Sequence, residues 1–337
     1  EETMLKVAIL GMGMMGGFHA QKYAQLPNAQ VVAIADADPE RLQNAKGVAG
    51  NIEREDADAG MQDVARYPDA ATLIREAEVD VIDVCLPSFM HAQYTIQALE
   101  AGRHVLCEKP MALNVEDADR MLDAAERADR TLMIAQCVRF WPEYLYLRQV
   151  VEQGTYGKLL SLHMSRLGGR PIWSWEQWFQ DPARSGAAVY DLHIHDVDYV
   201  HSLLGLPDRV QATGRATGAT GGIDAVHALY DYDGGPQVHI VGGWSMAQIP
   251  FQAQYEAWFE RGVLRYDGRS DPTLTVYEDL TKTSPQPVEF EPGDAYLNEI
   301  AYFIDCLEKG VAPERCPARS ARDSLALVAR EIAAVDD

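Results

Sequence analysis

The sequence has few cysteines, few basic residues and no long apolar run, and each shortage excludes a class of protein. Its five cysteines are scattered without a CxxC pair, which argues against a disulfide framework and a structural zinc site. Lysine and arginine total 29 against 51 acidic residues, and the net charge of -22 repels phosphate backbones, so nucleic acid is not an expected partner. No apolar run approaches the roughly 18 residues of a membrane span, and residues 1–10 lack a secretory signal. We expect a cytoplasmic protein with no membrane partner.

The length and composition favour an ordinary globular protein with more than one domain. A chain of 337 residues exceeds one ordinary core, and 47% hydrophobic with 24% charged residues suits packed domains. In the first half, apolar strands alternate with helical segments, which predicts a parallel, doubly wound sheet. The fold class is therefore α/β.

A glycine motif follows the first apolar run. Residues 5–10 predict a strand, and the motif GMGMMG at 11–16 leads into a helical segment. Gly11 permits a tight turn, Gly13 lets the backbone approach a pyrophosphate, and Gly16 lets helix and strand pack closely. Free N–H groups at the helix start then meet the anion. The motif predicts a dinucleotide site.

The next strand selects the cofactor. Residues 30–35 end in Asp36, at the expected distance after the glycines, where a carboxylate can accept hydrogen bonds from both adenosine ribose hydroxyls. Such a carboxylate repels a 2′-phosphate, and Ala37 supplies no basic group to reverse the preference. The expected cofactor is NAD.

Two further strand ends carry polar groups toward the same edge of the sheet. Residues 79–86 predict a buried strand followed by Pro87, Ser88 and His91, and His91 either contacts the nicotinamide or substrate or only caps and packs its helix. Residues 104–113 (HVLCEKPMAL) predict another buried strand.

In that second segment, Glu108 and Lys109 emerge at the carboxyl end of the strand, where ligands bind in open α/β sheets. Pro110 restricts Lys109 to extended backbone conformations. Taken alone, the tripeptide also matches a surface lysine where a strand meets a loop. Glu108 is expected to support the cofactor or the geometry of Lys109.

Together these segments resemble the Gfo/Idh/MocA oxidoreductases, which include glucose-fructose oxidoreductase and inositol dehydrogenases. The resemblance rests on GMGMMG, the strand-ending Asp36, CLPSFMH and above all CEKPMAL, and it extends over nearly the whole chain. It implies an N-terminal Rossmann domain joined to a C-terminal α/β domain with an open, mostly antiparallel sheet. The expected cofactor-binding residues are Gly11, Gly13, Met14, Met15, Gly16, Asp36, Pro87, Ser88, His91, Glu108, Lys109, Gln136 and Tyr296.

The predicted domains are 1–135, which binds NAD, and 136–337, which binds substrate and mediates oligomerisation. Glycine turns between the later strands favour antiparallel neighbours. One face of such a sheet needs a partner, so we expect a homo-oligomer, a dimer or a tetramer. A C-terminal helix could pack back on the first domain. Strands are expected at 159–167, 210–217, 224–232, 237–245, 254–260, 263–266 and 273–277.

Residues 185–205 (SGAAVYDLHIHDVDYVHSLLG) predict one helix with a glycine stop. Asp191 and His195 lie one turn apart on one face, so the carboxylate can orient the imidazole and stabilise its protonated form. A solvated contact between the two is the other interpretation. The resemblance favours catalysis, because family members carry an Asp-xxx-His pair here together with the lysine of EKP. The expected buried stripe consists of Tyr190, Ile194, Val197, His201 and Leu204.

A metal site in this helix is disfavoured. Asp191, His193, His195 and Asp198 offer ligand types, but histidines two apart on a helix diverge by about 200°. No metal is expected.

Arginine and tryptophan side chains precede this helix, and they could hold the hydroxyls and C–H surfaces of a sugar or polyol. Ordinary packing explains the tryptophans equally well. The candidate substrate residues are Arg166, Arg170, Trp173 and Trp178, with Trp175 between them.

The sequence therefore predicts an NAD-dependent dehydrogenase acting on a carbinol of a sugar, cyclitol or related polyhydroxy compound. His195 exchanges the hydroxyl proton, Asp191 orients it, and Lys109 stabilises the developing alkoxide, although lysine and histidine could exchange roles. Two alternatives stay open: a sugar-processing enzyme that oxidises its substrate only transiently, and a non-catalytic NAD-binding regulatory protein.

Overall fold

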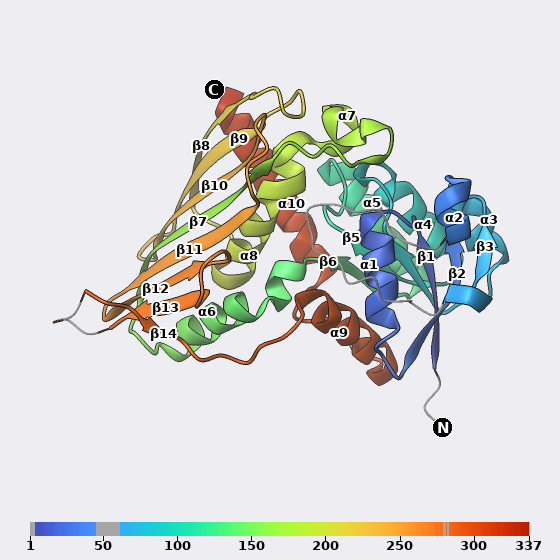
Figure 1. Ribbon diagram of the computed structural model, residues 1–337, viewed down its shortest axis with the longest axis horizontal. Coiled ribbons are helices and arrows are strands. Elements are labelled where there is room, and N and C mark those ends of the chain that lie inside the picture. Colours follow the sequence, from blue (N-terminus) through green and yellow to red (C-terminus); the bar gives the residue numbers. More distant parts are fainter. Residues whose placement is uncertain (1–3, 45–60, 279–280, 282, 337) are drawn as a thin grey trace. The chain divides into compact units, whose positions relative to one another are not determined.

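The computed structural model describes residues 4–44, 61–278, 281 and 283–336 (Figure 1). Contacts divide the chain into two compact units. The first comprises residues 1–137, 173–178 and 295–323, and the second comprises the remaining segments. Each unit contains one sheet.

The sheet of the first unit has six parallel strands in the order β3-β2-β1-β4-β5-β6. The order reverses direction at β1 and β4, which is the switch point where doubly wound sheets bind nucleotides. Four residues of β4 are buried, including the carboxylate of Asp83. The strands are β1 (Leu5–Leu10), β2 (Ala29–Ala35), β3 (Ala65–Tyr67), β4 (Val81–Val84), β5 (His104–Glu108) and β6 (Leu132–Ala135).

Two helices of the first unit, α3 and α5, begin at residues whose polar side chains cap them. The Asp69 carboxylate accepts the Thr72 N–H, and the Asn114 side chain accepts the Asp117 N–H, so each satisfies a free donor of the first turn. The helices are α1 (Met14–Tyr23), α2 (Pro39–Asn44), α3 (Ala70–Glu76), α4 (His91–Glu100), α5 (Val115–Ala128), α9 (Ala295–Lys309) and the first part of α10 (Ala318–Asp336).

The second unit holds an eight-stranded sheet in the order β14-β13-β12-β11-β7-β10-β9-β8. All neighbours are antiparallel except β7 and β10, which run parallel. The predicted α/β class with a second, mostly antiparallel sheet is confirmed. The strands are β7 (Leu159–Gly169), β8 (Arg209–Arg215), β9 (Ala225–Asp231), β10 (Gln237–Ser245), β11 (Gln252–Phe259), β12 (Gly262–Asp267), β13 (Leu274–Tyr277) and β14 (Gln286–Pro287).

The predicted single helix over 185–205 is wrong. The short helix α7 (Pro182–Ser185) ends at Gly186, and a π-helical turn, η5 (Val189–His193), then precedes α8 (Ile194–Leu204). Gly186 and Ala187 both have positive φ angles, of 74° and 60°, which a continuing helix does not allow. The remaining helix of this unit is α6 (Pro142–Gln153).

Candidate functional site

The glycine turn between β1 and α1 is shaped by close backbone approaches. A Cβ added to Gly16 would lie 1.8 Å from the Gly11 carbonyl oxygen, and Gly11 itself has a φ of 89°. Among the residues that the structure describes, a Cβ at Gly13 would meet only the Arg41 side chain, at 4.0 Å, so the backbone there is open to a ligand. These surroundings match the three separate functions predicted for the glycines.

Asp36, at the end of β2, is tied to that turn. Its Oδ2 accepts the Met12 N–H at 2.7 Å and its Oδ1 accepts the Asp38 N–H at 2.8 Å. Each carboxylate oxygen can accept a second hydrogen bond, so the side chain is held in place while retaining capacity for two ribose hydroxyls.

Glu108 and Lys109 leave the carboxyl end of β5, as predicted. Glu108 is only 6% exposed, and its Oε2 accepts the backbone N–H of Lys109 at 3.1 Å. The side chain of Lys109 is partly exposed, and its peptide bond to Pro110 is cis. The buried carboxylate thus fixes the backbone from which the lysine extends.

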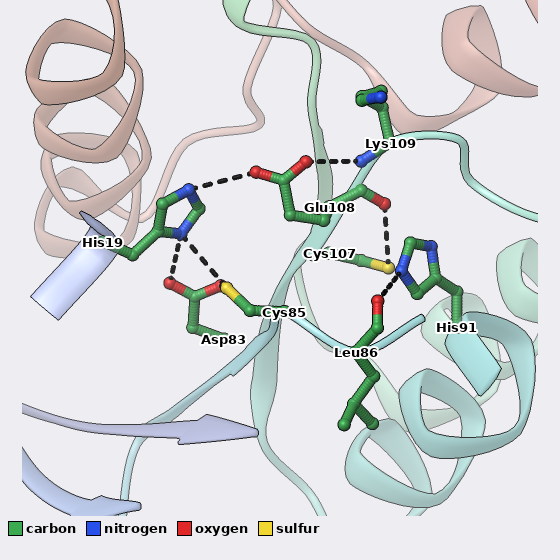
Figure 2. A network of polar contacts seen from close by, with 8 residues as sticks. All are labelled: His19, Asp83, Cys85, Leu86, His91, Cys107, Glu108 and Lys109. Carbon is green, nitrogen blue, oxygen red and sulfur yellow. Dashed lines mark hydrogen bonds and ion pairs between the residues drawn. The ribbon is translucent and has the colours of Figure 1, made fainter. Parts of the chain in front are cut away.

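Behind Glu108 lies a buried histidine that the sequence interpretation missed (Figure 2). The imidazole of His19, in α1, has its Nδ1 2.8 Å from Asp83 Oδ2 and its Nε2 3.1 Å from Glu108 Oε1. Burial opposes its charge, but Asp83 and Cys85 outweigh burial and raise the pKa of His19 well above its ordinary value. Burial likewise opposes ionisation of Glu108, yet His19 and then Lys109 leave the pKa of that carboxyl lowered.

His91 joins two loops at the same edge of the sheet. Its Nδ1 lies 2.7 Å from the Pro110 carbonyl oxygen and its Nε2 lies 2.7 Å from that of Leu86. His91 is 1% exposed and Ser88 is 4% exposed. These contacts favour the packing interpretation of His91, which holds the loop after β4 against the loop after β5.

Gln136 and Tyr296 complete the predicted cofactor residues of the first unit. Gln136 follows β6 and is 1% exposed, and neither its amide nitrogen nor its amide oxygen has a hydrogen-bond partner among the described residues. Tyr296, in α9, packs its ring edge-on against Phe18 of α1 at 4.8 Å. Burial, followed by the nearby Cys137 and Glu108, raises the pKa of Tyr296 well above its usual value.

In the second unit, the π-helical turn lies directly before the predicted catalytic histidine. Asp191 is 7% exposed and accepts a hydrogen bond from Trp244 Nε1 at 3.1 Å. His195 is the one residue of the segment 191–200 that is not buried. Single π-helical turns occur frequently at functional sites because they redirect side chains within a helix.

His193 holds the π-helical turn in place through a buried contact. Its Nε2 lies 3.0 Å from Glu331 Oε2, and the other oxygen of Glu331 accepts the Tyr230 hydroxyl. A Cβ on Gly242 in β10 would lie 2.7 Å from the Cβ of His193, so the glycine lets the turn approach the sheet closely. His193 therefore supports the turn through its Nε2.

Two aspartates of α8 are fully buried, and each forms an ion pair with a buried arginine. Asp198 is fully buried and forms a bidentate pair with Arg139, at 2.7 and 2.6 Å. Asp196, also fully buried, lies 2.7 Å from Arg166. Both ion pairs join elements distant in the sequence.

Arg166 was predicted to contact substrate. It is 2% exposed, and besides Asp196 its guanidinium donates to the Tyr144 hydroxyl at 3.0 Å. This burial favours a structural role over substrate binding. Arg170 is partly exposed. Trp173 and Trp178 are also partly exposed, and they belong to the first unit.

Comparison with protein-family models agrees with the fold of both units. A family model described as the oxidoreductase family with an NAD-binding Rossmann fold matches residues 5–136, and a GFO/IDH/MocA C-terminal domain matches residues 144–265. The chain belongs to the Gfo/Idh/MocA family. As a member of this family it is an NAD-dependent oxidoreductase, and the predicted family, enzyme class and cofactor are confirmed.

Relatives of this Gfo/Idh/MocA protein span nearly its full length. It is 26% identical to a myo-inositol 2-dehydrogenase of Thermotoga maritima, covering 92% of this chain and 90% of the relative. It is 28% identical to a D-apiose dehydrogenase of Paraburkholderia graminis, covering 96% and 85%. Among solved structures, a UDP-N-acetylglucosamine 3-dehydrogenase of Acidithiobacillus ferrooxidans has a TM-score of 0.78 at 25% identity, covering 99% and 98%.

The first unit of this family member fits NAD on its own geometry. The open backbone at Gly13 can receive a pyrophosphate, and Asp36 is held ready for ribose hydroxyls. The buried amide of Gln136, which no described group satisfies, is in the state expected of a side chain whose partner is a ligand. Among the residues described, no helix is long and apolar enough to cross a membrane.

Proposed function

We propose that the protein is a dehydrogenase that moves a hydride between NAD and a carbinol carbon of a sugar, cyclitol or related polyhydroxy compound. Its relatives are named for inositol, apiose and a UDP-linked amino sugar, all of which carry several hydroxyl groups. This shared chemistry supports the substrate class. It does not select one member of that class.

The observation that carries the proposal is the strand exit at Glu108 and Lys109. A buried, ionised carboxylate accepts the Lys109 N–H, so the backbone of a partly exposed ammonium-bearing residue is fixed at the nucleotide edge of the sheet. A fixed cation at this edge is suited to bind a substrate oxygen and to stabilise negative charge that develops there.

Three side chains share the chemistry in this proposal. Bound NAD would supply the hydride acceptor, C4 of its nicotinamide. Lys109 binds the hydroxyl oxygen and lowers the energy of the developing alkoxide, while His195 takes the hydroxyl proton. Asp191 orients the imidazole and stabilises the charge that His195 gains, so the substrate leaves as a carbonyl compound and one proton is released.

Lys109→Ala is the direct test. We expect the wild-type protein to accumulate NADH with at least one compound from a panel of sugars, inositols and sugar acids. Lys109→Ala should lose about 100-fold or more in kcat while still binding NADH, because one stabilising charge in the transition state is worth several kcal/mol. Lys309→Ala, which removes an exposed ammonium from α9, is the matched control and should retain full activity.

The outcomes separate the proposal from its alternatives. Turnover of Lys109→Ala near that of the wild type contradicts the function assigned to the lysine. Product formation without net NADH points to transient oxidation, in which the hydride returns to the substrate. NADH binding without turnover of any compound points to a regulatory protein.

The proposed substrate-binding and oligomerisation domain is residues 136–337, and the second unit makes up most of it, without residues 173–178 and 295–323. Outward side chains of its sheet include Leu229 and Trp258, which are 51% and 49% exposed. Exposed apolar side chains on an open sheet favour a homo-oligomer, a dimer or a tetramer, which light scattering would measure. The cytoplasm stays the predicted compartment.

A further inference from the structure

One imidazole in the first unit faces two carboxylates. His19 is fully buried, as is Asp83, and Glu108 is 6% exposed (Figure 2). Both ring nitrogens lie within 3.1 Å of a carboxylate oxygen, Nδ1 at 2.8 Å from Asp83 and Nε2 at 3.1 Å from Glu108. Nδ1 forms a hydrogen bond with Asp83, whereas the contact between Nε2 and Glu108 is an ion-pair distance without hydrogen-bond geometry.

The number of donors in this arrangement decides the protonation of the ring. A neutral imidazole carries one N–H, so its other nitrogen would present a lone pair to an ionised oxygen. The doubly protonated ring donates to Asp83 and places its second N–H beside Glu108. It also supplies positive charge next to two buried carboxylates, in addition to the charge of Lys109 near Glu108, and such carboxylates are costly to bury without a partner.

A bound metal ion is the competing explanation, because His19, Asp83 and Cys85 offer three ligand types close together. Zinc bonds of about 2.0–2.1 Å to nitrogen and oxygen place tetrahedral ligands about 3.3 Å apart. The 2.8 Å between His19 Nδ1 and Asp83 Oδ2 is shorter than that separation and is an ordinary hydrogen-bond distance. The geometry favours a proton between these two atoms.

We propose that His19 is a positioning residue that stays protonated throughout catalysis: its imidazolium bridges Asp83 and Glu108 and thereby fixes the backbone of Lys109. The connection is short. Glu108 uses Oε1 toward His19 and Oε2 toward the Lys109 N–H. The inference rests on the proposed function of Lys109, and it adds a residue that touches neither cofactor nor substrate.

Protonated His19 also connects Lys109 to the nucleotide site. His19 belongs to α1, the helix that starts directly after the glycine turn, while Asp83 belongs to β4 and Glu108 ends β5. One buried cation thus ties the pyrophosphate-binding helix to the two strands at the switch point. The other ionisable groups that interact with His19, Asp83 or Glu108 are Tyr23, Cys85, His91, Cys107, Lys109 and Tyr296.

Nitrogen NMR on protein labelled with ¹⁵N-histidine tests the protonation directly and needs no substrate. We expect His19 to show two protonated nitrogens from about pH 6 to about pH 8.5, a range in which an ordinary histidine loses its charge. The His19→Gln variant assigns the signals. If that variant does not fold, Glu108→Gln, which keeps the Asp83 contact, shifts the same signals. A neutral His19 in this range overturns the proposal, as does a tightly bound metal ion in the purified wild-type protein.

Hydrogen exchange tests the link to Lys109. In His19→Gln the Lys109 amide should exchange about tenfold faster or more, because Glu108 is no longer held as its acceptor. His104→Gln is the matched control, since His104 lies on the same strand and only accepts the Thr131 N–H. Equal exchange in the wild type and His19→Gln overturns the positioning role.

Activity gives a third signature where a substrate has been found. Without the imidazolium, Glu108 loses the charge of His19 that helps to lower its pKa, so this carboxyl should bind a proton at a higher pH than before. The kcat of His19→Gln should therefore be about tenfold or more below that of the wild type near neutral pH and recover as the pH falls, with NADH binding nearly unchanged. A uniform loss at every pH would indicate a merely structural role and contradict the proposal. Failure to find any substrate would count against the proposed function alone, because the NMR and exchange results would still stand.

Discussion

Replacing Asp36 by serine should change which dinucleotide the protein prefers. The carboxylate holds two backbone N–H groups, from Met12 and Asp38, and retains one acceptor position on each oxygen for ribose. Among the described residues, Arg41 is a basic residue near this site: its guanidinium lies 4.0 Å from a Cβ built on Gly13 and 3.5 Å from Asp38. The sequence interpretation considered only Ala37 and overlooked this cation.

The magnitude follows from the contacts. Losing a hydrogen bond to a charged group costs about 1.5–3 kcal/mol, so Asp36→Ser should weaken NADH binding about 10- to 100-fold. A carboxylate about 4 Å from a phosphate near a protein surface repels it by about 4 kcal/mol before salt screening. Removing that repulsion while Arg41 stays should strengthen NADPH binding about tenfold or more.

The assay is titration of protein fluorescence with NADH and NADPH, which requires no substrate. Asp36→Ser combined with Arg41→Ala is the matched control and should lose the gain in NADPH affinity while keeping the loss for NADH. Tighter binding of NADPH than NADH by the wild type would refute the reasoning. So would an unchanged ratio of the two affinities in Asp36→Ser.

Two further predictions concern stability. Asp198→Asn leaves the guanidinium of Arg139, 2% exposed, without its buried counter-charge, and should lower the free energy of unfolding in urea by about 3–5 kcal/mol. The double variant Arg139→Met with Asp198→Leu should recover most of that loss. A loss under about 1 kcal/mol in Asp198→Asn would mean that the pair behaves like an exposed one. Burial lowers the pKa of His91 below its ordinary 6.5. Between the lowered and the ordinary pKa, His91 is therefore protonated in the unfolded chain and neutral in the folded chain. This contribution to stability is complete above about pH 6.5 and is lost as the pH falls through the lowered pKa of the folded protein. The wild type should therefore be more stable than His91→Gln by an amount that shrinks from about pH 7 to about pH 5. A stability difference that stays constant over this range would contradict the prediction.

Periodic segments were predictable because their patterns are local. The strands at 5–10 and 237–245 have the bounds expected from their sequences. Buried parallel strands read as short apolar runs and glycine stops mark helix ends, so no distant residue is needed to recognise them.

The helix at 185–205 was mispredicted for a local reason. Its apolar residues recur at helical spacing, but the pattern does not register the left-handed backbone of Gly186 and Ala187 or the wider π-helical turn that follows. Sheet contacts through Gly242 and the buried pair of His193 and Glu331 stabilise that turn. They come from parts of the chain that no window around the helix contains.

The buried charges were missed because their partners are distant in sequence. Asp83 offered a signal, since a carboxylate inside an otherwise apolar strand needs a counter-charge. The partner, His19, lies 64 residues away. Similarly, Arg139 and Asp198 are 59 residues apart, and only the fold brings them together.

The first unit is assembled from three stretches of chain, the last of which is residues 295–323. Because helix α9 belongs to this unit, the nucleotide-binding unit cannot be completed during synthesis until residues 295–323 have left the ribosome. A single cut near residue 137 would release a fragment that lacks α9, with the apolar surface that Ile300, Phe303 and Ile304 cover in the intact chain left bare. A cut at the apparent division between the two sheets would therefore remove part of the first unit itself.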